Sequence, residues 1–249
     1  GDTFPVTATV DGKSFTVDNK GNVTSTGSSD QTPTEQGTLG TVTGSETKNT
    51  TVKDSLGNQV VVPAGFKVVN KDANVTDGIV VEDVSHSATA GSQFVWIPVG
   101  DVIKDSAGNK ETITLGRYVF NADESGSVNT ELSKTEPGDQ LKTSSSASNY
   151  FTEGLKDSTT SNTHAKDIED FKNKVTNTTH GYYIGRYESR KNGTQVTVKA
   201  SDTVYNNITQ PNAATVSRGM YSDSNFKSDL MNSYAWDTAI VFLQKFDNR

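Results

Sequence analysis

Apolar and polar residues alternate at the start of the chain, which is the pattern of a β-strand with one apolar and one polar face. The runs 4–10 and 13–17 alternate on either side of Asp11-Gly12, and this dipeptide between two such runs favours a two-residue hairpin turn. Val23-Thr24 follows a second turn and starts a third strand. The pattern predicts a small β-hairpin unit over residues 1–30.

The stretch 31–49 breaks this alternation. It is rich in Ser, Thr and Gly and offers almost nothing to bury, so we interpret it as a linker. The β pattern resumes at Thr50, which predicts a second, larger module over residues 50–249. Within that module residues 121–165 are rich in Ser, Thr and Asp, and we expect a long polar surface insertion or a poorly ordered loop there.

One turn sequence occurs twice in the second module. Asp54-Ser-Leu-Gly-Asn58 and Asp105-Ser-Ala-Gly-Asn109 each lie between short β patterns, and their Gly can adopt a positive φ. Asp and Asn oxygens also suit calcium, but both segments lack the alternating acidic ligands and the terminal Glu of an EF-hand loop. The pattern therefore favours turns over calcium sites.

Helical periodicity is confined to three segments. Residues 165–175 place Ile168, Phe171 and Val175 on one stripe, and residues 212–220 follow Pro211 as a short helix. Ser233 is a candidate cap for a third helix. In this third helix Trp236, Ile240 and Leu243 share a face, which Ala239, Phe242 and Phe246 widen, so we expect that face to be buried.

Composition sets the class of fold. Hydrophobic residues make up only 31% of the 249 residues, and Thr, Ser, Asn, Asp and Gly replace them. This mixture suits strands, hairpins and polar loops and does not fit a helical bundle. Together with the three helical segments, it predicts an α+β, β-rich fold.

The net charge limits the classes of binding partner, and the absence of cysteine limits the catalytic and metal-binding chemistry. The formal net charge of −7 disfavours nucleic acid and anionic membranes, and no stretch approaches the ~20 apolar residues that span a bilayer. The absence of cysteine excludes disulfides, thiolate catalysis and Cys-ligated zinc. With the abundance of Thr, Asn and Ser, it favours an exported bacterial protein, and the start at Gly1 without Met is typical of a processed or trimmed product.

Three apolar motifs resemble one family. Phe94–Gly100, Gly181–Glu188 and Tyr234–Leu243 resemble, in order, the opening strand, the Arg-Tyr-Glu strand and the following helix of formylglycine-generating-enzyme-like (sulfatase-modifying-factor) domains, a branch of the C-type-lectin-like fold. The sequences of these three motifs, together with those of Asn74–Val80 and Thr209–Ala214, are also similar to Clostridia-type pilin-like surface proteins. The resemblance covers roughly residues 50–249 and implies a C-type-lectin-like module there.

The sequence also departs from that family. Val99 stands where a second Gly is usual, and Asp101-Val-Ile103 follows instead of Phe and Met-Gly. The oxidase members use a pair of cysteines and copper, which this chain cannot provide, so we expect no enzyme activity and no cofactor. In the family a Gly/Trp/Arg-rich half would follow Arg249. We therefore expect a module incomplete at its C-terminus, in a chain that is naturally short, was truncated or continues.

Few residues are candidates for chemistry. His86, His164 and His180 are too far apart in sequence to form a metal pair on one element, and we interpret them as polar loop residues, with no metal site. Arg186 and Glu188 share one side of a strand, and we expect either to pair with Asp237 or with a neighbour in a structural ion pair rather than a catalytic dyad. We predict no catalytic, cofactor-binding or metal-binding residue. The structural core candidates are Trp96, Tyr183, Arg186, Glu188, Trp236 and Asp237.

The resemblance and the composition together indicate a non-catalytic extracellular protein of the cell surface. The leading hypothesis is the globular part of a pilin-like filament subunit that self-associates and displays a C-type-lectin-like module. The alternative is a secreted adhesin or receptor-binding module for a glycan or a protein, which would use variable loops on a rigid scaffold. A formylglycine-generating-type enzyme is the remote alternative.

Overall fold

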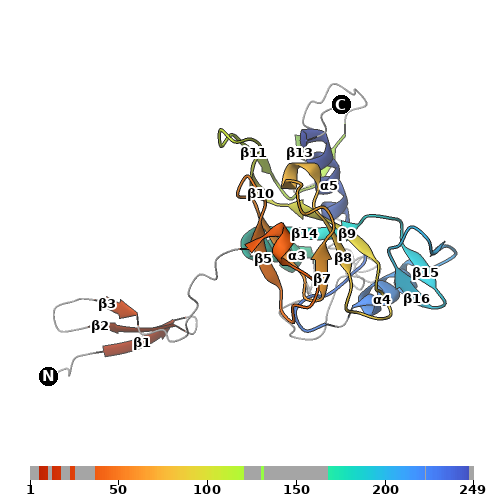
Figure 1. Cartoon of the computed structure of the whole chain (residues 1–249), viewed down its shortest axis with the longest axis horizontal. Coiled ribbons are helices and arrows are strands. Elements are labelled where there is room, and N and C mark those ends of the chain that lie inside the picture. The colour runs from red at the N-terminus through yellow and green to blue at the C-terminus, as the bar shows by residue number, and fades with distance from the viewer. Residues whose placement is uncertain are drawn as a thin grey trace. The chain divides into compact units, whose positions relative to one another are not determined.

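The computed structural model describes residues 6–10, 13–17, 23–25, 37–120, 130–131, 168–221 and 223–246. The chain divides into two compact units, Gly1–Glu35 and Gln36–Arg249. Figure 1 shows both units and labels many of their helices and strands.

The first unit is a small antiparallel sheet of three strands, β1 (Val6–Val10), β2 (Lys13–Val17) and β3 (Val23–Ser25), in that order. Val10 pairs with Lys13, so the connection between β1 and β2 has the predicted hairpin length. In the register Val6 faces Val17, which faces Val23, whereas the adjacent row is formed by threonines. The predicted hairpin unit with a third strand is confirmed.

The second unit begins earlier than the sequence suggested. β4 (Gly37–Thr38) pairs in parallel with β5 (Thr50–Lys53), and the 3-10 turn η1 (Leu39–Thr41) follows β4 directly. Leu39 and Val42 are buried in the main core. The predicted linker 31–49 is therefore too long at its C-terminal end. Two features hold this polar stretch on the second unit: the burial of Leu39 and Val42, and the pairing of β4 with the distant strand β5.

A four-stranded antiparallel sheet forms the centre of the second unit, in the order β14-β9-β8-β7. Its strands are β7 (Phe66–Val68), β8 (Val80–Asp83), β9 (Gln93–Pro98) and β14 (Gly181–Gly185). A second sheet has the order β4-β5-β6, with β6 at Gln59–Val62, and the 3-10 turn η2 spans Val75–Asp77. The first and third family-like motifs thus lie on β9 and on helix α5 (Ser233–Phe246), and the second begins on β14.

Smaller sheets surround this centre. The hairpin β10 (Gly100–Ile103) with β11 (Lys110–Ile113) extends from the end of β9. β12 (Tyr118–Val119) pairs with β13 (Thr130–Glu131). β13 is the part of the predicted insertion 121–165 that the structure describes, and the other residues of the insertion lie outside the described ranges. β15 (Arg190–Asn192), β16 (Gln195–Thr197) and β17 (Thr203–Val204) form a further sheet, in the order β16-β15-β17.

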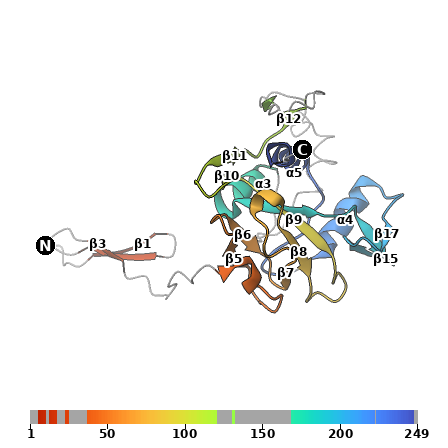
Figure 2. The same cartoon turned by 45° about the horizontal axis from the view of Figure 1, so that its top comes forward.

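Helices occur at the three predicted places. α3 (Ile168–Lys174) continues into a π-helical turn, η4 (Val175–Thr179), which ends at His180 with a left-handed φ of 54°. α4 (Gln210–Met220) has Pro211 in its first turn, and α5 (Ser233–Phe246) is the longest of the three. In Figures 1 and 2, α4 lies beside the β15–β17 sheet, whereas α5 lies beside the β10–β11 hairpin and away from α4. No helix among the described residues is long and apolar enough to cross a membrane.

The core lies around the central sheet. Trp96 on β9 is 2% exposed and packs against the ring of Tyr183 on β14, with ring centroids 5.1 Å apart. A Cβ at Gly181 would lie 2.2 Å from Cζ2 of Trp96, so the indole requires glycine at that position. A second, smaller cluster contains Val175, with Phe171 packed against it, as the predicted helical stripe requires. The β-rich α+β class is confirmed.

The orientation of α5 differs from the prediction. Trp236 and Leu243, expected on the buried face, are 56% and 60% exposed. Ala239 and Phe242 are buried as expected, but Asp237 and Thr238 are buried with them. Polar contacts of Asp237 and Thr238 with residues 116–118 account for the difference.

Candidate functional site

The predicted core residues separate into two groups. Trp96 and Asp237 are buried, and Tyr183 donates its hydroxyl to the carbonyl of Val61 at 2.9 Å. Burial raises the pKa of Tyr183 well above its usual range. Arg186, Glu188 and Trp236 are exposed, so their assignment to the core was wrong.

Asp237 is the buried anion that anchors α5. Its Oδ2 accepts from Nε of Arg117 at 2.8 Å and from the backbone N–H of Tyr118 at 3.0 Å. Next to it, Thr238 Oγ1 accepts from the backbone N–H of Gly116 at 3.1 Å. The residues 116–118 thus bind the polar side of α5 and turn it inward. Asp237 pairs with Arg117, so the alternative in which Arg186 or Glu188 pairs with Asp237 was wrong. Arg186 does bind a neighbour, but this is the neutral side chain of Gln93, to which it donates at 2.7 Å.

An apolar stripe faces outward on α5 as a consequence. Trp236 and Leu243 are among the most exposed large apolar side chains of the described residues, and half-buried Ile240 lies between them. We call Trp236, Ile240 and Leu243 the α5 stripe. The charged side chains of α5 are Asp237, paired with Arg117, and Lys245, whose Nζ lies 2.7 Å from Glu111 Oε1. The stripe is therefore apolar and carries no uncompensated charge.

A second notable cluster surrounds His86. Its Nδ1 lies 2.9 Å from Oδ1 of Asp83, whose side chain is fully buried, and its Nε2 lies 3.5 Å from Oδ2 of Asp223. The other oxygen of Asp83 accepts from Thr89 and Tyr221, and burial together with the Asp83 charge raises the pKa of Tyr221. The imidazole also contacts the rings of Phe66, Tyr221 and Phe226.

This arrangement suits a structural role better than a catalytic one. We call His86 with Asp83 and Asp223 the His86 latch, because it joins separate segments of the chain. In nucleophilic catalysis a histidine between a carboxylate and a hydroxyl or thiol removes the proton of the nucleophile. Here the second nitrogen of His86 faces the carboxylate of Asp223. Although burial opposes it, hydrogen bonds from Asn225 and His86 lower the pKa of Asp223. The cluster therefore ties the residues after α4 to the β8–β9 connection, a role that the polar-loop interpretation of His86 missed.

The remaining residues that were weighed as metal or calcium ligands are the other two histidines and the aspartates of the two turns. His180 ends the π-helical turn, and His164 lies outside the described residues. The carboxylates of Asp54 and Asp105 accept backbone N–H groups and the side-chain amide of the Asn within their own turns, as the turn interpretation requires. Among the described residues, no group of three or more His, Asp or Glu is arranged to hold a metal ion.

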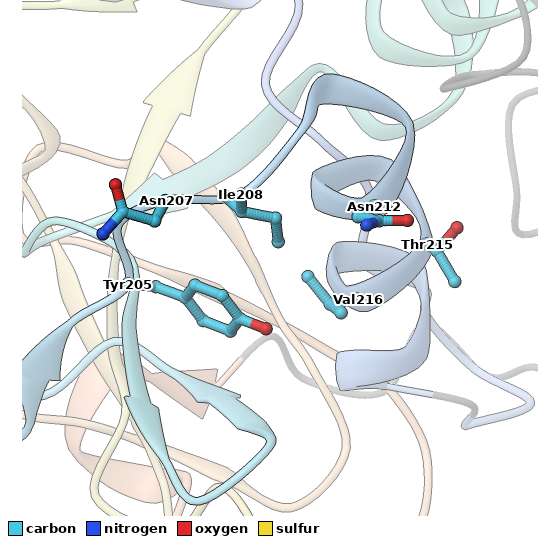
Figure 3. Close-up of a pocket in the computed structure, with 6 residues that line it drawn as sticks. All are labelled: Tyr205, Asn207, Ile208, Asn212, Thr215 and Val216. Carbon is cyan, nitrogen blue, oxygen red and sulfur yellow. The ribbon is translucent and has the colours of Figure 1, made fainter.

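A shallow pocket lies between α4 and the segment after β17, with a volume of about 250 Å³. Figure 3 shows its lining, in which the Tyr205 ring, Ile208 and Val216 point toward one another. Asn207, Asn212 and Thr215 supply neutral polar groups, and Asn207 adopts a left-handed φ of 54°. Nζ of Lys191 lies 5.1 Å from the centre of the Tyr205 ring. The pocket is smaller than the ~300–1,000 Å³ of typical small-molecule sites.

Comparisons of the chain with known protein families, with curated proteins and with solved structures found no match. The resemblance to formylglycine-generating-enzyme-like domains therefore stays a prediction from the three motifs.

Proposed function

We propose that this chain is the globular part of a non-catalytic extracellular surface protein, a pilin-like filament subunit that assembles with copies of itself. The α5 stripe is the observation that carries this proposal. Contiguous exposed apolar side chains with a polar surround are typical of protein–protein contacts.

The way in which α5 is held supports an assembly contact. A contact surface works best when it is already rigid before association, because less conformational entropy is then lost. The buried Asp237–Arg117 pair fixes the rotation of the helix, and Lys245 fixes its C-terminal turn to Glu111. The stripe is thus presented by a helix that is part of the core.

We also propose a C-type-lectin-like module for the second unit. Its support is the order of the three motifs along the chain, carried by β9, β14 with the residues after it, and α5. In such a module the loops on a rigid scaffold would be displayed by the filament.

Electron microscopy of the protein isolated from its native source without denaturation tests the proposal. We expect regular assemblies, and we expect the recombinant chain to associate with increasing concentration in sedimentation experiments. Trp236→Glu should abolish this association, whereas Val69→Glu, which alters a residue that is 42% exposed on another surface, should not. Dispersed particles at all concentrations would remove the basis of the filament proposal.

The Tyr205 pocket favours a second function, that of an adhesin or receptor-binding module. Its neutral polar lining and aromatic ring suit a small neutral ligand such as a sugar ring or part of a peptide. A glycan array tests this function. Tyr205→Ala should remove any signal, while Tyr187→Ala, which alters a tyrosine outside the pocket, should keep it. A signal that both variants retain would exclude this pocket as the binding site.

A further inference from the structure

We propose that the α5 stripe pairs with the same stripe of a second copy, with the two helices antiparallel about a two-fold axis next to Ile240. This inference rests on the proposed self-assembly and names its contact.

The spacing of the three side chains lets the stripe pack against a second copy of itself that runs in the opposite direction. Trp236, Ile240 and Leu243 occupy positions i, i+4 and i+7, which lie on one side of an α-helix and span ~10 Å at ~1.5 Å per residue. Reversing one helix about the midpoint of the stripe sets Trp236 against Leu243 of the second copy, at both ends. It also brings the two Ile240 side chains together near the axis. An isologous contact of this kind is the commonest in symmetric oligomers.

The charges on α5 permit the same pairing. The chain carries a formal net charge of −7, so two copies repel each other over most approaches. α5 itself adds no unpaired charge to this repulsion, because Asp237 and Lys245 are already paired within the subunit. Two copies can thus bring their α5 helices together without placing unpaired like charges of the helices opposite each other, which would cost stability.

The area of the stripe sets the strength of the contact. Three side chains bury much less than the ~1,200–2,000 Å² of a stable protein pair. We therefore expect weak association in dilute solution. A two-fold contact closes on itself, so a filament needs another contact elsewhere on the subunit. The α5 pairing would then join subunits two by two within a larger assembly.

The absence of cysteine makes cross-linking a direct test, because every disulfide must come from an introduced residue. Ile240→Cys keeps both ends of the stripe and should give at least ten-fold more oxidised dimer than Val69→Cys at the same concentration. In a mixture of Trp236→Cys with size-tagged Leu243→Cys, the mixed dimer should exceed both homodimers. Predominance of the Trp236→Cys homodimer would indicate parallel helices and overturn the antiparallel pairing.

The two tryptophans provide a second readout. Trp96 is 2% exposed, so iodide should quench mainly Trp236, which is 56% exposed. We expect efficient quenching in dilute solution and protection as concentration rises. Protection already in the dilute monomer would mean that the chain itself covers the stripe, and it would overturn the pairing.

The outcomes also separate this inference from the proposed function. Assembly seen by microscopy without preferential cross-linking at residue 240 would overturn the α5 pairing and would mean that the filament is built through another contact of the subunit. A chain that neither assembles nor cross-links would overturn both.

Discussion

Two turns of the second unit have nearly the same sequence and the same local structure. In Asp54–Asn58 and in Asp105–Asn109, Oδ1 of the Asp accepts the backbone N–H groups of the third and fifth residues, at 2.8–3.1 Å. In both turns Oδ2 accepts from the side-chain amide of the Asn, at 2.9 and 2.8 Å. Both glycines have a positive φ, 96° at Gly57 and 82° at Gly108.

The surroundings of the two turns differ. Asp54 and Asn58 are buried, whereas Asn109 is exposed. Asp54 accepts a further hydrogen bond from the backbone N–H of Val75 at 2.8 Å. Asn58 exchanges two hydrogen bonds with the backbone of Ile103, at 2.8 and 2.7 Å. The first turn thus joins three segments of the chain, while the hydrogen bonds of the second stay within its own hairpin.

The comparison shows that one short sequence can specify one local structure and still have two different structural roles. The local hydrogen bonds depend only on residue types and their spacing. The role depends on which other segments lie within reach. Substitutions at equivalent positions of the two turns should separate the local contribution from the tertiary one.

The largest difference is expected at the two aspartates. Asp54→Ala leaves buried N–H groups of two segments without an acceptor and should lower the free energy of unfolding by about 3–5 kcal/mol. Asp105→Ala exposes its donors to water and should have a much smaller effect. Urea unfolding of the whole chain measures both. Equal losses at the two positions would mean that the tertiary bond to Val75 contributes little.

The asparagines should show the next largest difference. Asn58→Ala removes both partners of the Ile103 backbone and should cost about 2 kcal/mol. Asn109→Ala should stay within about 0.5 kcal/mol of the parent, as for most surface substitutions. The same unfolding experiment compares them, and a loss at Asn109 as large as at Asn58 would contradict the distinction between the turns.

The glycines should behave alike. An added Cβ at Gly57 meets its nearest neighbour at 3.9 Å and at Gly108 meets nothing within 4 Å, so only the positive φ opposes a side chain. Gly57→Ala and Gly108→Ala should each cost about 1 kcal/mol. A clear inequality in the unfolding free energies would show that packing also acts at one of the two glycines.

The smallest effect concerns the titration of Asp105. The hydrogen bond from the Asn109 side chain is the main cause that lowers the pKa of Asp105; desolvation opposes it, and the backbone N–H groups of Asn109 and Ala107 lower the pKa further. The folded state therefore favours the carboxylate. Its contribution to stability is complete above the unfolded pKa and is lost as the pH falls through the folded pKa. Asn109→Ala should raise the pKa of Asp105 toward its ordinary value in an NMR titration, and an unchanged pKa would exclude the side-chain hydrogen bond as a cause.

Much of the fold followed from local patterns. The first hairpin, the two turns, the β-rich class and the places of the three helices were predictable, because turn residues and periodicity act over a few positions. The start of the second unit was not, because the pairing of Gly37 with Val52 joins residues distant in sequence. The latch around His86 was missed for the same reason, since Asp83 and Asp223 approach it from separate parts of the chain.

α5 shows where periodicity fails. Its apolar residues extend over most of its circumference, so the sequence alone allowed more than one inward face. The contacts of Asp237 and Thr238 with residues 116–118 selected the face, because a buried carboxylate without partners costs more than three partly exposed apolar side chains. One signal was present in the sequence: Asp237 and Thr238 interrupt the apolar run, and a polar pair there favours bonding partners.

The sequence by itself determined the local structure of this protein, namely its hairpins, turns and helical segments, and it excluded thiol chemistry. The tertiary structure decided which of these elements share a core, which carboxylates are buried and which side of α5 faces outward. The physical reason is the range of the interactions involved. Turn geometry and helical periodicity depend on residues a few positions apart, whereas burial and ion pairing depend on segments that meet only after the chain has folded.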